Sequence, residues 1–150
     1  MARGVDVAGA AHLVLAAGVV HLDAPRAVFD GMLSGWVAQQ RSRMLNQTTI
    51  TGREWLVRRF AAFTNEYPWA WRAVDVEEFT TSLRTGGAAH STIRGYHLIL
   101  SLFVDFVCDP RYGWVDECQE RFGRAPALIC HEWTRPHTSA CSRAARAAAR

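Results

Sequence analysis

Hydroxyl and arginine side chains gather in one short stretch after the glycine pair of "RTGGAAHSTIRGYHLIL". Ser91, Thr92 and Arg94 lie within four positions, Tyr96 and His97 follow, and no acidic residue interrupts them. Such side chains donate hydrogen bonds to phosphate oxygens and to base edges. A helix that begins here would add unpaired backbone N–H groups and the positive end of its dipole. The stretch therefore predicts a contact with the phosphate backbone of a nucleic acid.

A second group of the same chemistry lies earlier in the sequence. Residues 41 to 60 hold five arginines and a single acid, Glu54. All 17 cationic residues of the chain are arginine, whose planar guanidinium binds phosphate and guanine in a bidentate manner. The net charge of +3 is only mildly basic, so the distribution of the arginines carries the indication. The candidate DNA contacts in this second group are Arg41, Arg43, Thr49, Thr51 and Arg53. We expect this group and the stretch after the glycine pair to share one rim of the fold and to form a single cationic face.

Apolar residues at helical spacing predict the first two helices. Thr51 and Glu54 match a capping box at the start of the second helix, with Ile50 and Trp55 placed as a hydrophobic staple. Pro68 is expected to stop this helix. The stripe of the first helix is Phe29, Met32, Leu33, Trp36 and Val37, and the inner face of the second is Leu56, Val57, Phe60 and Phe63.

Two further helices follow, separated by the glycine pair at residues 86 and 87. We expect the third to begin at Asp75, with Glu78 in the capping-box position, and the fourth to be capped by Ser91. Asp109-Pro110 should end the fourth helix. The inner face of the third is Val76, Phe79 and Leu83, and that of the fourth is Ile99, Leu102, Phe103, Phe106 and Val107.

No alternating strand pattern of useful length appears, so the sequence predicts an all-α fold. We expect a compact four-helix bundle, one short extra C-terminal helix in "YGWVDECQERFG", and flexible tails. The predicted division is a poorly patterned segment over residues 1–25, a helical DNA-binding domain over 26–115, a short helix and linker over 116–133, and an Ala/Arg-rich, disordered tail over 134–150.

Several classes of function are disfavoured by the sequence. No catalytic motif with its supporting residues is found, so no enzyme, cofactor or small-molecule substrate is expected. Cys130, His131, His137 and Cys141 resemble a metal site only superficially, because adjacent residues rarely ligate one ion, and no metal is expected. The apolar run at residues 8–20 is too short to span a bilayer, so no membrane is expected. The four cysteines form no C-x-x-C pair, which indicates reduced thiols and a cytoplasmic protein.

The runs "TITGREWLVRRFAAFTNEY", "VDVEEFTTSL" and "HSTIRGYHLILSLFVDFVCDPRYGW" resemble the core-binding (SAM-like) domain of phage-type tyrosine recombinases, over about residues 26 to 115. The resemblance implies a four-helix domain that binds a recombination site together with a following catalytic domain. The continuation looks like the linker of actinobacterial integrases. One departure is that many relatives carry a basic residue midway along the fourth helix, where this chain has Leu98, Ile99 and Leu100. The matching residues are Thr51, Leu56, Phe60, Phe63, Ser91, Thr92, Arg94, Leu102, Phe103 and Phe106.

The catalytic arginine, lysine, histidine and tyrosine residues of that family have no counterpart in this sequence. The resemblance therefore implies an integrase truncated before its catalytic domain, whose partners are double-stranded DNA and a full-length recombinase. Two alternatives stay open. One is a small helix-turn-helix regulator with "TTSLRTGGAAHSTIRGYHL" as its motif, and the other is a non-functional integrase remnant.

Overall fold

The computed structural model of this chain describes residues 7–16 and 23–129, which form helices and no strand. The predicted all-α fold is confirmed for this part of the chain. The predicted tail at 134–150 and the cluster from Cys130 to Cys141 lie outside the described residues. The α-helices are α1 (Ala11–Ala16), α2 (Ala24–Ser42), α3 (Gln47–Thr64), α4 (Ala73–Thr85), α5 (His90–Cys108) and α6 (Trp114–Phe122), with 3₁₀ turns η1 (Pro68–Ala70) and η2 (Pro110–Tyr112).

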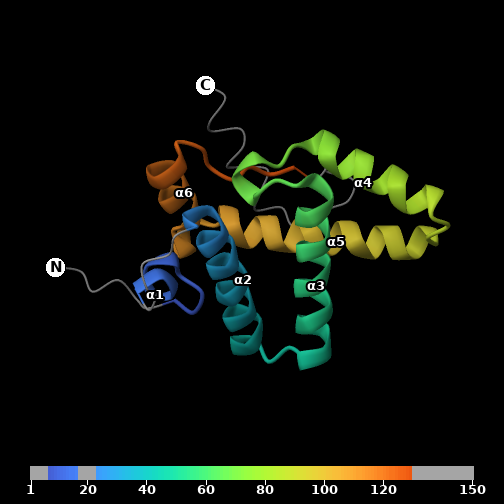
Figure 1. The fold of residues 1–150 in the computed structure, drawn as a ribbon. Helices are drawn as coiled ribbons and strands as arrows, with labels where there is room; N and C mark the ends of the chain where they lie inside the picture. The colour runs from blue at the N-terminus through green and yellow to red at the C-terminus, as the bar shows by residue number, and fades with distance from the viewer. Residues whose placement is uncertain (1–6, 17–22, 130–150) are drawn as a thin grey trace, which may run out of the picture.

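The four long helices α2 to α5 enclose an aromatic core. Figure 1 shows α2 and α3 joined by a short turn, while α4 and α5 form a hairpin whose tip extends away from the other helices. Trp36 of α2 and Phe103 of α5 are buried with ring centroids 5.2 Å apart, and Phe60 of α3 lies 4.9 Å from Trp71. Rings from three helices and one connection therefore meet in a single core, as the apolar stripes predicted.

The start of α3 differs from the sequence prediction. The N-cap is Asn46, whose side chain accepts a hydrogen bond of 2.8 Å from the backbone N–H of Thr48. Thr51 consequently lies inside α3 and caps nothing, so the predicted capping box is wrong. Trp55, expected as half of the staple, is 55% exposed.

The end of α3 also precedes its predicted stop. The helix ends at Thr64 because Asn65 takes a left-handed conformation with φ 52°, and Pro68 instead opens the turn η1. Phe63, expected to face inward, is 42% exposed, although its ring lies 5.2 Å from that of Phe79. An apolar residue therefore remains partly exposed beside α4.

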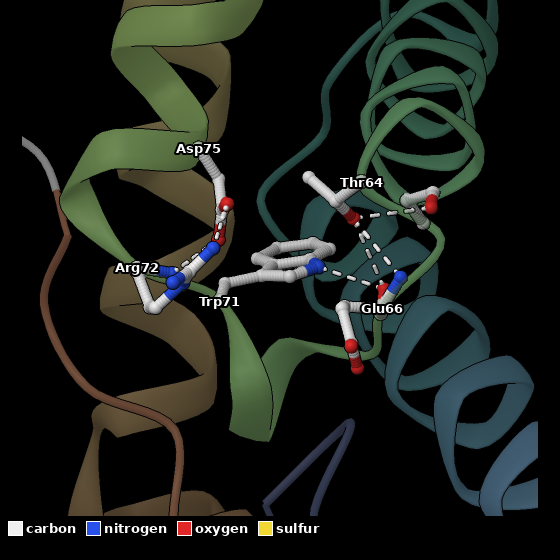
Figure 2. A network of polar contacts seen from close by, with 6 residues as sticks. Thr64, Glu66, Trp71, Arg72 and Asp75 are labelled. Carbon is white, nitrogen blue, oxygen red and sulfur yellow. Dashed lines mark hydrogen bonds and ion pairs between the residues drawn. The ribbon is translucent and has the colours of Figure 1, made fainter.

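The connection from α3 to α4 is held by the network drawn in Figure 2. The indole Nε1 of Trp71 donates to the backbone carbonyl of Glu66 at 2.9 Å, and the Thr64 hydroxyl accepts from the Glu66 N–H at 3.1 Å. Asp75 is buried, and it accepts from the backbone N–H of Arg72 at 2.8 Å and from Arg72 Nη2 at 3.0 Å. Asp75 therefore stabilises the helix start from its first turn, two residues after the true beginning of α4.

The start of α5 likewise lies one residue before the predicted cap. His90 is the first residue of the helix and Ala89 is the N-cap, which makes no side-chain hydrogen bond. Ser91 is exposed in the first turn, so the prediction that it caps the helix is wrong. The predicted end is confirmed, because α5 stops at Cys108 before Asp109 and Pro110.

The described N-terminal segment packs on α2 and is part of the core. Ala10 and Ala11 are each 1% exposed, and a Cβ added to Gly35 of α2 would lie 2.7 Å from the carbonyl oxygen of Gly9. That carbonyl accepts a hydrogen bond of 3.0 Å from the buried indole of Trp114 in α6. The short helix predicted after residue 110 is thus confirmed as α6, and it shares one core with the helices before it.

One described helix, α5, is long and apolar enough by composition to cross a membrane, with a mean hydropathy of 1.2. The apolar composition of α5 is explained by the fold, because the second half of the helix forms the centre of the core. The buried side chains of α5 are Ile93, His97, Leu100, Ser101, Phe103, Val104, Phe106 and Val107.

Candidate nucleic-acid interface

The first half of α5 displays three of the predicted contact residues on the surface. Ser91, Thr92 and Arg94 are all exposed, on the hairpin tip that extends beyond α3 in Figure 1. Arg94 makes no ion pair with a carboxylate of the described residues, and the first turn of α5 contains no acidic residue. These side chains are therefore available to an anionic ligand.

Tyr96 lies on the side of α5 that meets α3, where it contacts an arginine that sequence reasoning missed. The guanidinium of Arg59 lies 5.3 Å from the ring of Trp55, 5.9 Å from that of Phe79 and 5.9 Å from that of Tyr96. Cation–π contacts of this kind hold a guanidinium in place while its hydrogen-bond donors remain free. The spacing of four residues between Trp55 and Arg59 could have indicated the pair, because it places both on one helix face.

His97 is buried and does not lie on this surface. It is 5% exposed, and its Nε2 lies 2.6 Å from the hydroxyl of Thr80 on α4. The Thr80 hydroxyl also lies 2.8 Å from the carbonyl oxygen of Val76, to which it donates within α4. Burial lowers the pKa of the imidazole below its usual value. The prediction that His97 contacts DNA is therefore wrong for this conformation, and the residue joins α4 to α5 instead.

The second group of predicted residues surrounds the turn between α2 and α3. Arg41, Arg43, Thr49 and Thr51 are all exposed. Two nitrogens of Arg41 donate to the side-chain oxygen of Gln47, at 3.4 and 3.3 Å. This turn is a second cationic surface on the molecule.

Arg43 lies close enough to an acid to affect its titration. The pKa of Asp109 is lowered first by hydrogen bonding from Arg111, and the charge of Arg43 makes a smaller contribution in the same direction. The charge of Arg43 is therefore partly balanced within the protein, unlike that of Arg94.

Arg53 has a structural contact that the sequence did not indicate. It is half-buried, and its Nη1 donates to the side-chain oxygen of Gln40 on α2 at 3.2 Å. Gln40 is only 2% exposed, and its amide nitrogen has no hydrogen-bond partner among the described residues. Arg53 therefore covers a buried polar side chain between α2 and α3.

The two helix starts do not adjoin. In Figure 1, α3 begins at the foot of the molecule near its turn with α2, whereas α5 begins at the tip of the hairpin with α4. One contact between the two helices, Arg59–Tyr96, lies farther along both of them. Two cationic groups thus replace the single rim that the sequence suggested.

Several other arginines have carboxylate partners. Arg58 pairs with Asp30 at 3.0 Å, and Arg121 pairs with Glu117 at 2.8 Å on α6. No ion pair with a carboxylate of the described residues is formed by Arg41, Arg53, Arg59, Arg84, Arg94 or Arg124. Uncompensated positive charge therefore lies at the α2–α3 turn as well as on α3 and the hairpin.

Neither the ionisable residues nor the comparisons identify a further site. Over residues 7–16 and 23–129, no group of three His, Cys, Asp or Glu side chains could hold a metal ion. Burial raises the pKa of the Cys118 thiol to about 12, which is the state of an inert core cysteine. Comparison of the chain with known protein families, with curated proteins and with solved structures finds no match.

Proposed function

We propose that this chain is a duplex-DNA-binding domain of the core-binding type found in tyrosine recombinases, with α2 to α5 as its four-helix, SAM-like unit. The observation that carries the proposal is the exposed first half of α5. Ser91, Thr92 and Arg94 project there from a hairpin tip, with no acidic residue in the first turn of the helix. Hydroxyls and arginine at a helix start are a common means of binding the DNA backbone.

Arg59 extends this surface from α5 onto α3. Its guanidinium is oriented by Trp55 and Tyr96, so that little side-chain freedom would be lost when it binds a phosphate. Arg94 and Arg59 together would bind phosphates along one DNA strand where it crosses both helices. Tyr96 contributes by positioning Arg59.

In this proposal the chain binds DNA and catalyses no step itself. The partners are double-stranded DNA and, at a recombination site, a full-length recombinase that supplies the catalytic residues, in the cytoplasm. A single domain of a clamp should bind weakly, close to the non-specific range of about 10⁻⁴ to 10⁻⁶ M at physiological salt.

The helix-turn-helix alternative is less well supported by the geometry. Its two helices would cross at about 90–120°. In Figure 1, α5 returns alongside α4, and the Thr80–His97 contact joins the two helices along their length. The remaining alternative, a remnant without DNA affinity, is separated from the proposal by a binding experiment.

Fluorescence anisotropy with a labelled mixed-sequence duplex, measured over a salt series that begins at low salt, tests the proposal. Arg94→Ala and Arg59→Ala should each weaken binding and reduce the slope of log K against log salt by about 0.9. Arg121→Ala is the matched control, because Arg121 is paired with Glu117 on α6, and it should leave both quantities unchanged. Binding that is absent at low salt, or an equal loss in the Arg121 variant, would refute the proposal.

A further inference from the structure

The turn between α2 and α3 presents a methionine in an unusual state. Met44 has φ 62° and is 90% exposed, the highest exposure among the large hydrophobic side chains described. Asn65 is the other non-glycine residue with positive φ in the described ranges, and asparagine tolerates the left-handed region. A methionine does not share that tolerance, and glycine is the usual residue at such a position.

The backbone around Met44 forms a complete helix-ending motif. The N–H of Met44 donates to the carbonyl of Arg41 at 3.0 Å, and the N–H of Leu45 donates to the carbonyl of Gln40 at 3.2 Å. These are the two hydrogen bonds of the Schellman motif, in which the left-handed residue is most often glycine. The Ser42 hydroxyl adds a bond of 2.6 Å to the carbonyl of Gln39. The Met44 side chain is therefore exposed on a turn whose backbone is fixed by these hydrogen bonds.

The surroundings of Met44 are polar and cationic. Arg41 and Arg43 precede it and are exposed, and Asn46, Gln47 and Thr48 follow it on the surface. No acidic residue occurs in the sequence from residue 31 to residue 53. A cationic surface formed by a stretch without acidic residues is complementary in charge to a phosphate backbone, which favours DNA as the partner of this turn.

We propose that Met44 makes an apolar contact with duplex DNA, while Arg41 and Arg43 of the same turn bind the adjacent phosphates. This inference rests on the proposed function and extends the DNA-binding surface to the α2–α3 turn. The thioether can pack against deoxyribose or a thymine methyl group, which are the apolar surfaces that a duplex offers in its grooves. Within the free protein the side chain gains almost no burial and its backbone is strained, so a bound duplex supplies the stabilising contact that the fold does not.

Two substitutions at this position distinguish the effect of losing the side chain from the effect of relieving the backbone strain. Met44→Ala keeps a Cβ in the left-handed conformation and removes the thioether, so DNA affinity should fall by about threefold to tenfold with an unchanged melting temperature. Met44→Gly should show the same loss of affinity while raising the melting temperature by about 1 to 4 °C, because the strain is relieved. The salt slope should stay unchanged in both variants, since no phosphate contact is removed.

The measurement uses the labelled mixed-sequence duplex and the full chain, with Leu128→Ala as control because Leu128 is an exposed leucine outside the proposed surface. An affinity equal to that of the parent in both Met44 variants overturns the inference. If Arg94→Ala still weakens binding, the proposed function survives that result. If the parent chain does not bind the duplex at all, the proposed function itself fails.

Discussion

The close approach of Gly35 to Gly9 gives a sharp prediction about the N-terminal segment. A Cβ on Gly35 would lie 2.7 Å from the carbonyl oxygen of Gly9 and 3.2 Å from its Cα. Backbone atoms cannot rotate away as a side chain can, so Gly35→Ala must displace residues 7–10 from α2. The carbonyl that moves is the acceptor of the buried Trp114 indole N–H.

The expected magnitude follows from these contacts. Loss of the Trp114 hydrogen bond leaves a buried donor without a partner, which costs about 1–3 kcal/mol. Reduced packing of Ala10 and Ala11 adds to that cost, whereas alanine in a helix recovers about 0.5–1 kcal/mol relative to glycine. The net loss should be about 2–4 kcal/mol, which lowers the melting temperature of a chain of this size by about 5 to 15 °C.

Urea unfolding followed by tryptophan fluorescence measures this loss, with a matched glycine as control. Gly52 is an exposed position of α3, and a Cβ there would meet nothing within 4 Å. Gly52→Ala should therefore stabilise the protein, by up to about 1 kcal/mol. If the Gly35 and Gly52 variants shift stability in the same direction by similar amounts, residues 7–16 do not pack on α2 as described.

Three further predictions concern single side chains. Arg53→Ala should lower the free energy of unfolding by about 1 kcal/mol because it removes the hydrogen bond to the buried side-chain oxygen of Gln40, while Arg94→Ala should leave it unchanged in the same urea titration. Burial holds the pKa of His97 below 6.5, so the unfolded state binds the proton more readily than the folded state does. The contribution of this residue to the free energy of unfolding should therefore be complete above about pH 6.5 and decrease below it, and His97→Gln should flatten that pH dependence. With a pKa of about 12, Cys118 should resist alkylation at pH 8 in the folded protein and react on unfolding, as peptide mass spectrometry would reveal; rapid labelling of the native chain would contradict its burial.

The helices were predictable from the sequence because long apolar stripes leave few alternatives. Trp36, Phe60 and Phe103 recur with their neighbours at helical spacing, and all three are buried where helices cross. The Asp109-Pro110 pair also ended α5 as expected, since proline cannot continue a helix. Both signals depend only on residues that lie close together in the sequence.

The helix starts were harder to predict because several polar residues compete for each cap. Asn46 precedes Thr51 by little more than one turn, and a pattern search prefers the complete threonine–glutamate box. Three more hydrogen-bonding residues, Gln47, Thr48 and Thr49, separate the candidates, so only the backbone conformation decides between them. A cap that moves by five residues leaves the helix axis in place, but it changes which backbone N–H groups face the solvent.

The candidate site was only partly predictable because the environment of each side chain is tertiary. Arg53 and Arg59 look alike in "TGREWLVRRF", yet one covers Gln40 and the other lies among aromatic rings. His97 follows Tyr96 directly, and the helix turns it toward Thr80 and away from the solvent. Apart from the four-residue spacing of Trp55 and Arg59, no sequence pattern distinguishes these outcomes, because each depends on which helix packs alongside.

The two halves of α5 differ because they have different neighbours. The first half lies beyond α3 and needs one narrow apolar stripe against α4, supplied by Ile93 and His97 at a spacing of four. The second half is surrounded, so its buried residues spread around the helix from Leu100 to Val107. Most exposed positions of α5 consequently lie in the first half. Candidate contact residues such as Arg94 are thereby separated from the core, so a substitution there can leave the fold unchanged.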